Sequence, residues 1–225
     1  MLVYRMRILL ADDHQILLQG LKGMLEKHPG FEVVGEAGNG RVAVELAREL
    51  KPDAVLMDVA MPDLNGIEAT RQIKGGSPAT KVIALSMHED PLFVREMLRA
   101  GASGYLLKES AFDEVIRALN AVTSNQAFFS PAVARVVMGD YLDRGDGKPI
   151  PPEKTGTRVF DILSAREREV LQLIAEGNST REIGKRLFVS VKTVEGHRRL
   201  IMQKTNIKSV AELTRYAVRE GITKL

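Results

Sequence analysis

Over residues 1–125, hydrophobic and polar positions alternate between two patterns. Short apolar runs, often rich in β-branched residues, occur at Met6–Ala11, Phe31–Ala37, Ala54–Met57, Lys81–Ser86 and Gly104–Leu107. Between them, apolar positions recur at helical spacing over His14–His28, Arg41–Leu50, Gly66–Lys74, Pro91–Ala100 and Phe112–Thr123. This succession of strand–helix units predicts an α/β fold with a doubly wound, five-stranded parallel sheet covered by helices on both faces.

Two details of the pattern refine this prediction. Ala54–Met57 contains no polar residue, as expected for a central strand that is buried on both sides. In the first helical segment, apolar and small residues follow the i, i+3, i+4 spacing of one face. We therefore expect a single buried stripe made of Ile16, Leu17, Gly20, Leu21, Met24 and Leu25.

From residue 161 onward, the pattern is helical throughout. Each expected helix begins after a serine that can cap its first turn, namely Ser164, Ser179, Ser190 and Ser209. Glu167 and Glu182 stand three residues after the first two serines and complete capping boxes. The third helix is expected from Val191 to about Lys204. The tail is thus predicted to be a small all-α four-helix domain that contains a helix-turn-helix, the elementary DNA-reading unit.

The segment between the two patterns is rich in proline, glycine and charge, and includes Gly145-Asp146-Gly147-Lys148-Pro149-Ile150-Pro151-Pro152. Such a composition is typical of an exposed interdomain segment. We expect an α/β domain over residues 1–125, a linker with a short helix over 126–160, and the helical domain over 161–225.

The charge follows the same division. The chain has 225 residues and a formal net charge of +3. Residues 1–139 carry 15 Lys and Arg against 17 Asp and Glu, residues 140–160 carry 4 against 4, and residues 161–225 carry 13 against 8. A weakly acidic first part and a basic tail favour two modules, the second of which faces a polyanion.

Composition excludes several classes of function. The chain has no cysteine, which excludes disulfides, thiolate metal sites and a cysteine nucleophile. Its apolar runs are far shorter than the ~18 residues of a membrane span, and its first residues lack the layout of a signal peptide. We therefore expect a cytoplasmic protein with no membrane partner.

Polar side chains occur where the expected strands end. Asp12 and Asp13 follow the first strand, Asp58 follows the third, Ser86 ends the fourth and Lys108 follows the fifth. The carboxyl ends of parallel strands meet at one edge of a sheet, where ligands bind. Carboxylates with waters suit Mg²⁺, and an aspartate beside it can attack a phosphoryl group to give an acyl phosphate. Any one of these acids taken alone is more often a turn or cap residue.

Residues 6–125 resemble the receiver domain of bacterial two-component response regulators. The motifs that carry the resemblance are Ala11-Asp12-Asp13-His14, Asp58-Val59-Ala60-Met61-Pro62-Asp63-Leu64-Asn65-Gly66, Ala84-Leu85-Ser86 and Gly104-Tyr105-Leu106-Leu107-Lys108. The resemblance implies that Asp58 accepts a phosphoryl group from a sensor histidine kinase. It also implies that Mg²⁺ is bound by Asp12, Asp13, Asp58 and the backbone carbonyl of Ala60.

The same resemblance assigns the other polar groups. Ser86 and Tyr105 match a switch pair, in which the hydroxyl moves toward the phosphoryl group and the aromatic ring rotates inward. Lys108 matches the lysine that pairs with the phosphoryl oxygens. Positions Ala60 and His88 can tune how water reaches the acyl phosphate in this family, and we hypothesise the same effect here.

The tail resembles the LuxR-type helix-turn-helix domain that ends response regulators of the NarL/FixJ type. The segments Leu163–Leu171 and Ile183–His197 carry the resemblance. It implies binding to double-stranded DNA, with base contacts from Glu195, Gly196 and Arg199. It further implies that the last helix, Val210–Glu220, forms a contact in a DNA-bound homodimer on inverted half-sites.

The third expected helix, from Val191 to about Lys204, would be the recognition helix, and its physical chemistry supports binding to DNA. Positions 192, 195, 196 and 199 form one stripe that can enter a major groove. Arg199 can take a guanine through two hydrogen bonds, and Glu195 can accept from a cytosine amine. Lys192, Thr193, His197 and Arg198 are expected to contact phosphates. The buried side of the helix is expected to be formed by Val194, Leu200 and Ile201.

Two glycines depart from the commonest pattern of this motif. Gly184 lies inside a helix, where glycine costs about 1 kcal/mol relative to alanine, and we interpret it as permitting a close approach of the recognition helix. Gly196 offers no side chain at a readout position, which predicts weak or shape-based discrimination there.

The sequence therefore predicts a DNA-binding transcriptional regulator that is controlled by phosphorylation, dimerises when phosphorylated, and is not an enzyme. RNA polymerase is a further candidate partner. Two alternatives stay open: a Mg²⁺-dependent phosphohydrolase acting on a small substrate, and an adaptor that regulates without binding DNA.

Overall fold

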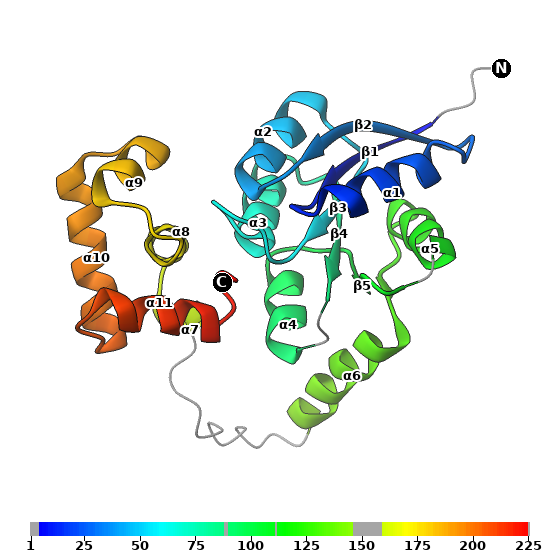
Figure 1. Cartoon of the computed structure of the whole chain (residues 1–225). Helices are drawn as coiled ribbons and strands as arrows, with labels where there is room; N and C mark the ends of the chain where they lie inside the picture. Colours follow the sequence, from blue (N-terminus) through cyan, green and yellow to red (C-terminus); the bar gives the residue numbers. More distant parts are fainter. Residues whose placement is uncertain (1–4, 88–89, 111, 146–158, 225) are drawn as a thin grey trace. The chain divides into compact units, whose positions relative to one another are not determined.

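The computed structural model describes residues 5–87, 90–110, 112–145 and 159–224. Their contacts divide the chain into two compact units, which are described one at a time (Figure 1). Among these residues, no helix is both long and apolar enough to cross a membrane. Position His88, which the sequence assigned to tuning of the acyl phosphate, lies outside the described residues.

The first unit is built on a parallel sheet. Its strands are β1 (Met6–Ala11), β2 (Phe31–Ala37), β3 (Ala54–Asp58), β4 (Lys81–Ser86), β5 (Gly104–Leu107) and β6 (Phe128–Phe129). They lie in the order β2-β1-β3-β4-β5-β6, and every neighbouring pair is parallel. This confirms the doubly wound parallel sheet that the apolar runs predict.

One strand was not predicted. Within the described residues the sheet has six strands, because Phe128 and Phe129 pair with Gly104 and Tyr105 at its edge. A strand of two residues is too short to produce an alternating or continuous apolar pattern, so the sequence placed it in the linker.

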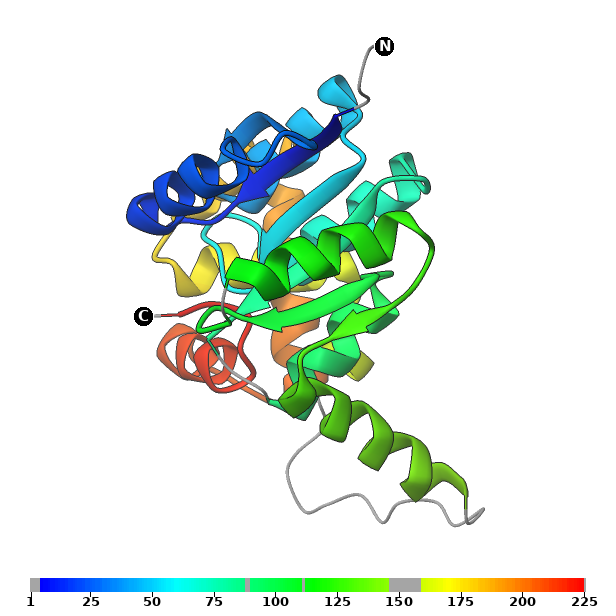
Figure 2. The ribbon, with the colours of Figure 1, turned by 90° about the vertical axis from the view of Figure 1, so that its right-hand side faces the viewer.

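The helices of this unit are α1 (Gln15–Leu25), α2 (Gly40–Leu50), α3 (Gly66–Gly76), α4 (Pro91–Arg99), α5 (Phe112–Thr123) and α6 (Pro131–Gly145). Helices α1 and α5 cover one face of the sheet, and α2, α3 and α4 cover the other (Figure 1). In Figure 2, the face that carries α1 and α5 is turned toward the viewer. The helix expected in the linker is present as α6, which follows Ser130, and residues 146–158 lie outside the described part.

The stripe predicted for α1 was partly wrong. The residues that enter the core are Leu18, Leu21 and Leu25, with Leu17 packed at its margin. Ile16 is 92% exposed and Met24 is 42% exposed. Because two neighbouring residues point 100° apart on a helix, the run of adjacent apolar pairs fits two faces, and only packing on the sheet selects one of them.

The second unit is helical. Its described elements are α7 (Val159–Ile162), α8 (Ala165–Ala175), α9 (Thr180–Leu187), α10 (Val191–Thr205) and α11 (Val210–Arg219). The four serines cap the predicted helices, and both capping boxes form. The single turn α7 was not predicted, and it begins inside the segment assigned to the linker. Its Val159 is fully buried in the core of the tail, so tertiary packing rather than a local pattern stabilises this turn.

The buried side of α10 differs at one position from the prediction. Val194 and Ile201 lie in the core, whereas Leu200 is 44% exposed. Residues 194 and 201 are seven apart and share a face, while residue 200 falls about 100° away from 201. Leu200 therefore faces solvent.

Candidate functional site

The polar residues at the strand ends meet in one place, which we call the acidic pocket: Asp12, Asp13, Asp58 and Lys108. Asp58 is the last residue of β3, Asp12 follows β1, and Lys108 follows β5. The Lys108 Nζ lies 2.7 Å from the Asp12 Oδ2 and 3.0 Å from the Asp58 Oδ2. All three side chains are at most 5% exposed. A buried ammonium thus bridges two buried carboxylates that come from strands separated in sequence.

The loop after β3 fixes the backbone around Asp58. The backbone N–H of Val59 donates to the Leu85 carbonyl at 3.1 Å, and that of Gly66 donates to the Val59 carbonyl at 2.9 Å. A Cβ at Gly66 would overlap the Asp58 carbonyl oxygen. The position accepts only glycine without a shift of the backbone, which explains why the loop carries Gly66.

The acidic pocket has the donor chemistry of a divalent-cation site. Ligand atoms of Asp12, Asp13, His14 and Asp58 all lie within 4.8 Å of one another. The His14 Nδ1 lies 2.9 Å from the Asp12 Oδ1 and 3.1 Å from the Asp13 Oδ1. Three carboxylates against one ammonium leave an excess of negative charge, and hard oxygen donors of this kind fit Mg²⁺.

The electrostatics of Asp58 reflect this crowding. Burial is the largest effect, followed by repulsion from Asp12, and together they raise the pKa of Asp58 to about 6. Lys108 and the backbone N–H of Ala60, which donates to the Asp58 Oδ1 at 3.3 Å, act in the opposite direction. Asp58 is therefore a carboxylate whose charge is poorly balanced by the protein alone.

The two residues matched to the switch pair lie on adjacent strands. Ser86 ends β4, Tyr105 lies on β5, and the register pairs Ala84 with Tyr105. Both side chains are buried, and the Tyr105 ring is fully enclosed. Burial raises the pKa of Tyr105 to about 12, against the effect of a hydrogen bond with Ser86. The phenol thus stays neutral and points into the protein.

The second set of predicted residues lies on α10 and faces outward. Lys192, Thr193, Glu195, Arg198 and Arg199 are exposed, whereas Gly196 and His197 are half-buried. We call Lys192, Glu195, Gly196 and Arg199 the α10 stripe, since they share one side of the helix. The helix begins at Ser190, whose Oγ accepts from the Thr193 backbone N–H at 3.1 Å and lies 2.8 Å from the Thr193 Oγ1.

The turn before α10 is tight. A Cβ at Gly184 would lie 3.0 Å from the Val189 carbonyl oxygen, which in turn supports the interpretation that this glycine permits close approach. The backbone N–H of Val189 donates to the Gly184 carbonyl at 3.0 Å. Phe188 has a left-handed backbone, with φ 54°, and ends α9.

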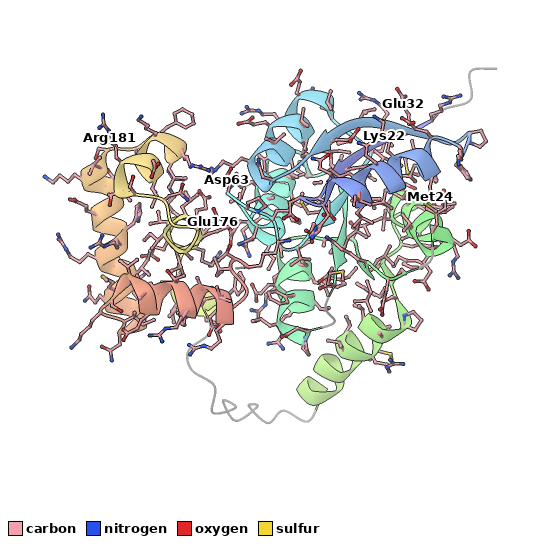
Figure 3. All side chains as sticks on the ribbon, in the orientation of Figure 1. Lys22, Met24, Glu32, Asp63, Glu176 and Arg181 are labelled. Carbon is pink, nitrogen blue, oxygen red and sulfur yellow. The ribbon has the colours of Figure 1, made fainter. Side chains whose placement is uncertain are left out.

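Two groups of residues were missed by reasoning from the sequence. On α9, Arg181 and Lys185 are exposed and four residues apart (Figure 3 labels Arg181). The sequence signal that could have identified them was their spacing of four residues on the first helix of the helix-turn-helix. On α1, exposed Ile16 and Met24 border a groove of about 520 Å³ whose lining includes Met87 and Lys108. Figure 3 labels Met24 on this helix. No sequence signal separates these two from the core residues of α1.

Comparisons with known proteins identify a family for each of the two units. Residues 8–120 match the family described as response regulator receiver domain, and residues 161–217 match the bacterial regulatory proteins of the luxR family. The transcriptional regulatory protein DegU of Brevibacillus brevis is 38% identical over 227 residues, which cover 98% of this chain and 96% of DegU.

Solved structures give the same result. The RcsB response regulator of Salmonella typhimurium is 27% identical, with a TM-score of 0.57 over 96% of this chain and 99% of its own. A structure of two RcsB dimers bound to two parallel DNAs is 28% identical, with a TM-score of 0.55 over 94% of this chain and 97% of that one. The chain therefore belongs to the two-component response regulators of the NarL/FixJ type, which join a receiver domain to a LuxR-type DNA-binding domain.

Proposed function

We propose that Asp58 is the phosphoacceptor of this response regulator and that a sensor histidine kinase is the phosphodonor. The observation that carries the proposal is the bridge from Lys108 to both Asp12 and Asp58 at 2.7 and 3.0 Å in a buried pocket. An ammonium in this place can move from the carboxylates to the phosphoryl oxygens when they arrive. Asp58 Oδ is the nucleophile, and the leaving nitrogen of the donor histidine keeps its electron pair.

Asp12, Asp13, Asp58 and the Ala60 carbonyl are the residues that would hold Mg²⁺. When bound, the metal neutralises the excess negative charge of the pocket and of the phosphoryl oxygens. The protein's own part is to keep Asp58 fixed at the end of β3 and Lys108 beside it. The raised pKa of Asp58 supports this assignment, since an unbalanced carboxylate gains most from a cation.

The macromolecular phosphodonor is proposed to cover the outer side of α1. Ile16, Met24 and Met87 are exposed apolar side chains around the groove that Lys108 also lines. Apolar side chains grouped beside a reactive carboxylate favour a protein donor over a small ester. This also argues against a phosphohydrolase that acts on a small substrate.

Output is proposed to pass from the switch pair to the helical tail. Phosphorylation of Asp58 would bias the positions of Ser86 and Tyr105, and the tail would then bind DNA as a homodimer on inverted half-sites. Base readout is assigned to Glu195, Gly196 and Arg199. Phosphate contacts are assigned to Lys192, Thr193, His197 and Arg198. The exposed cations Arg181 and Lys185 of α9 extend that phosphate-binding surface.

We assign the receiver to residues 1–125, the linker to 126–160 and the DNA-binding domain to 161–225, place the protein in the cytoplasm, and regard RNA polymerase as a second partner of the DNA-bound form. The protein is proposed not to be an enzyme with a small-molecule substrate of its own.

The test combines phosphorylation with DNA binding. The full chain is treated with acetyl [³²P]phosphate and Mg²⁺, and then incubated with a library of random duplexes. We expect label on the wild type, none on Asp58→Asn, and enrichment of a palindromic sequence by the phosphorylated protein. Label retained on Asp58→Asn would overturn the phosphoacceptor, and phosphorylation without any enriched sequence would favour an adaptor.

A further inference from the structure

Four consecutive charged residues open helix α8, and most of them are buried. The run is Arg166-Glu167-Arg168-Glu169, and Glu167, Arg168 and Glu169 are at most 6% exposed. Charged side chains are almost never buried unless they are paired. Arg166 and Glu169 pair with each other, and further partners of the run lie outside α8. Arg168, for example, stacks over Phe160 of α7 and donates to the Leu163 carbonyl.

Glu167 reaches the far end of the recognition helix. Its carboxylate accepts from the Ser164 backbone N–H at 2.7 Å, which closes the capping box of α8. The same Oε2 lies 2.7 Å from the Nζ of Lys204, in the last turn of α10. The pKa of Glu167 reflects both contacts: burial raises it, but Lys204 and Ser164 together hold it below its usual value. The Lys204 ammonium is therefore paired within the tail, although its side chain is partly exposed.

Arg166 reaches the end of α9, just before the turn that leads into α10. Its Nη1 donates to the Glu169 Oε2 at 2.8 Å, and its Nη2 donates to the Leu187 carbonyl at 2.8 Å. Leu187 is the last residue of α9, directly before the turn that leads into α10. A guanidinium held by one carboxylate thus binds the backbone of the turn with its second nitrogen, which is the geometry that a lysine cannot reproduce.

We propose that Arg166, Glu167 and Lys204 are positioning residues for DNA recognition. Adjacent residues of α8 hold the segments on either side of the reading surface: Arg166 binds the Leu187 carbonyl at the end of α9, just before the turn into α10, and Glu167 binds Lys204 in the last turn of α10. Together they fix the tilt of α10 across α8, and with it the direction in which the α10 stripe projects. None of the three has to touch DNA. This inference rests on the proposed function, in which α10 reads the bases.

The competing interpretation is that Lys204 binds a DNA phosphate, as a lysine on this helix easily could. The two differ in salt dependence. Each phosphate contact adds about 0.9 to the slope of log K against log salt for duplex DNA. Loss of a phosphate contact therefore lowers the slope by about 1 and weakens all sequences equally. Loss of a positioning contact leaves the slope unchanged and weakens the selected sequence alone.

The experiment uses the full chain, loaded with Mg²⁺ and the phosphoryl analogue BeF₃⁻. Two probes are compared: a duplex enriched from a random library by the wild type, and poly(dI-dC). The variants are Lys204→Met, Lys204→Arg as the conservative rescue, Arg166→Lys, and Lys208→Met as a matched loss of one exposed cation just beyond α10. All are assayed well below the melting temperature of the least stable variant, which is read by circular dichroism.

We expect Lys204→Met and Arg166→Lys to lower the ratio of selected to poly(dI-dC) affinity by roughly tenfold, within the range of one lost base contact. The salt slope on poly(dI-dC) should stay at the wild-type value, Lys204→Arg should restore the ratio, and Lys208→Met should leave it unchanged.

Three results overturn the proposal: an unchanged ratio in both Lys204→Met and Arg166→Lys, an equal loss on both probes with a lower slope, or a ratio that Lys208→Met reduces as much as Lys204→Met does. If Lys204→Met does not fold, Arg166→Lys decides alone. If the wild type enriches no sequence at all, the proposed function fails instead, so the two failures are distinguishable.

Discussion

The acidic pocket and the α10 stripe both carry charged side chains, but the charges of the pocket are buried and those of the stripe are exposed. In the pocket, Asp12, Asp58 and Lys108 are buried and pressed against one another. On α10, Lys192 and Arg199 are exposed to solvent. The phosphorylation proposed for Asp58 needs a fixed surrounding with little water, whereas the DNA binding proposed for α10 needs charge at the surface.

The two sets of charges also differ in their electrostatic cost to the folded protein. Burial, followed by repulsion from Asp12, raises the pKa of Asp58, which means that the folded protein bears an electrostatic cost when Asp58 is ionised. The exposed charges of α10 remain hydrated and cost the fold little. The charges of the acidic pocket therefore lower the stability of the receiver unit, whereas the exposed charges of α10 have little effect on the stability of the tail.

The largest effect that separates the acidic pocket from the α10 stripe is expected from Asp58→Asn. We expect phosphorylation by acetyl [³²P]phosphate to fall to background, because asparagine offers no carboxylate nucleophile. Arg199→Ala should keep full phosphorylation and lose affinity for the selected duplex. Asp113→Asn, which removes one exposed carboxylate from α5, serves as the matched control and should be labelled like the wild type.

Two glycines extend the comparison to the backbone. Gly66→Ala forces a Cβ into the Asp58 carbonyl and should lower the free energy of unfolding by about 2 kcal/mol or more. Gly196→Ala meets no atom within 4 Å and should raise it by about 1 kcal/mol, the helix propensity of alanine over glycine. Urea unfolding followed by circular dichroism measures both, and an equal effect of the two substitutions would contradict the assignment.

The strain at Asp58 gives a dependence on pH. A carboxyl group with a pKa of about 6 in the folded state against 3.8 unfolded stabilises the fold at low pH. That contribution is lost as pH rises from about 4 to about 6, by roughly 1–3 kcal/mol. Asp58→Asn should remove this loss. Mg²⁺ at ten times its dissociation constant should restore about 1.4 kcal/mol at neutral pH, measured as a shift of the melting temperature.

The smallest expected effect lies in the tail, at Glu167. Its pKa is held below the usual value, so its contribution is present above the unfolded pKa of about 4.5 and is lost as pH falls through the folded value. We expect less than about 1 kcal/mol, because Lys204 is partly exposed. Acid titration of the helical signal should show it in the wild type and not in Glu167→Gln, which keeps a capping side chain. A loss of stability on raising the pH instead would contradict the sign.

Much of both sites could be predicted from the sequence, because their signals are local. Asp12, Asp58 and Lys108 each follow an apolar run, and the geometry of parallel sheets alone brings such positions to one edge. From the four capping serines, the starts of α8, α9, α10 and α11 could be predicted. The errors fell where one pattern fits two orientations, at Ile16, Met24 and Leu200, since periodicity does not say which of two neighbouring positions meets the core.

By itself, the sequence determined the order of elements, the residues of the acidic pocket and the charged surface of α10, because each follows from periodicity, capping or the end of a strand. Only the tertiary structure decided which faces are buried, that Phe128–Phe129 joins the sheet, and that α7 packs into the tail. It also decided that Lys108 bridges two carboxylates, that Arg166 binds the end of α9 and that Glu167 pairs with Lys204 in the last turn of α10. Those features depend on contacts between residues far apart in the chain, which local pattern does not encode.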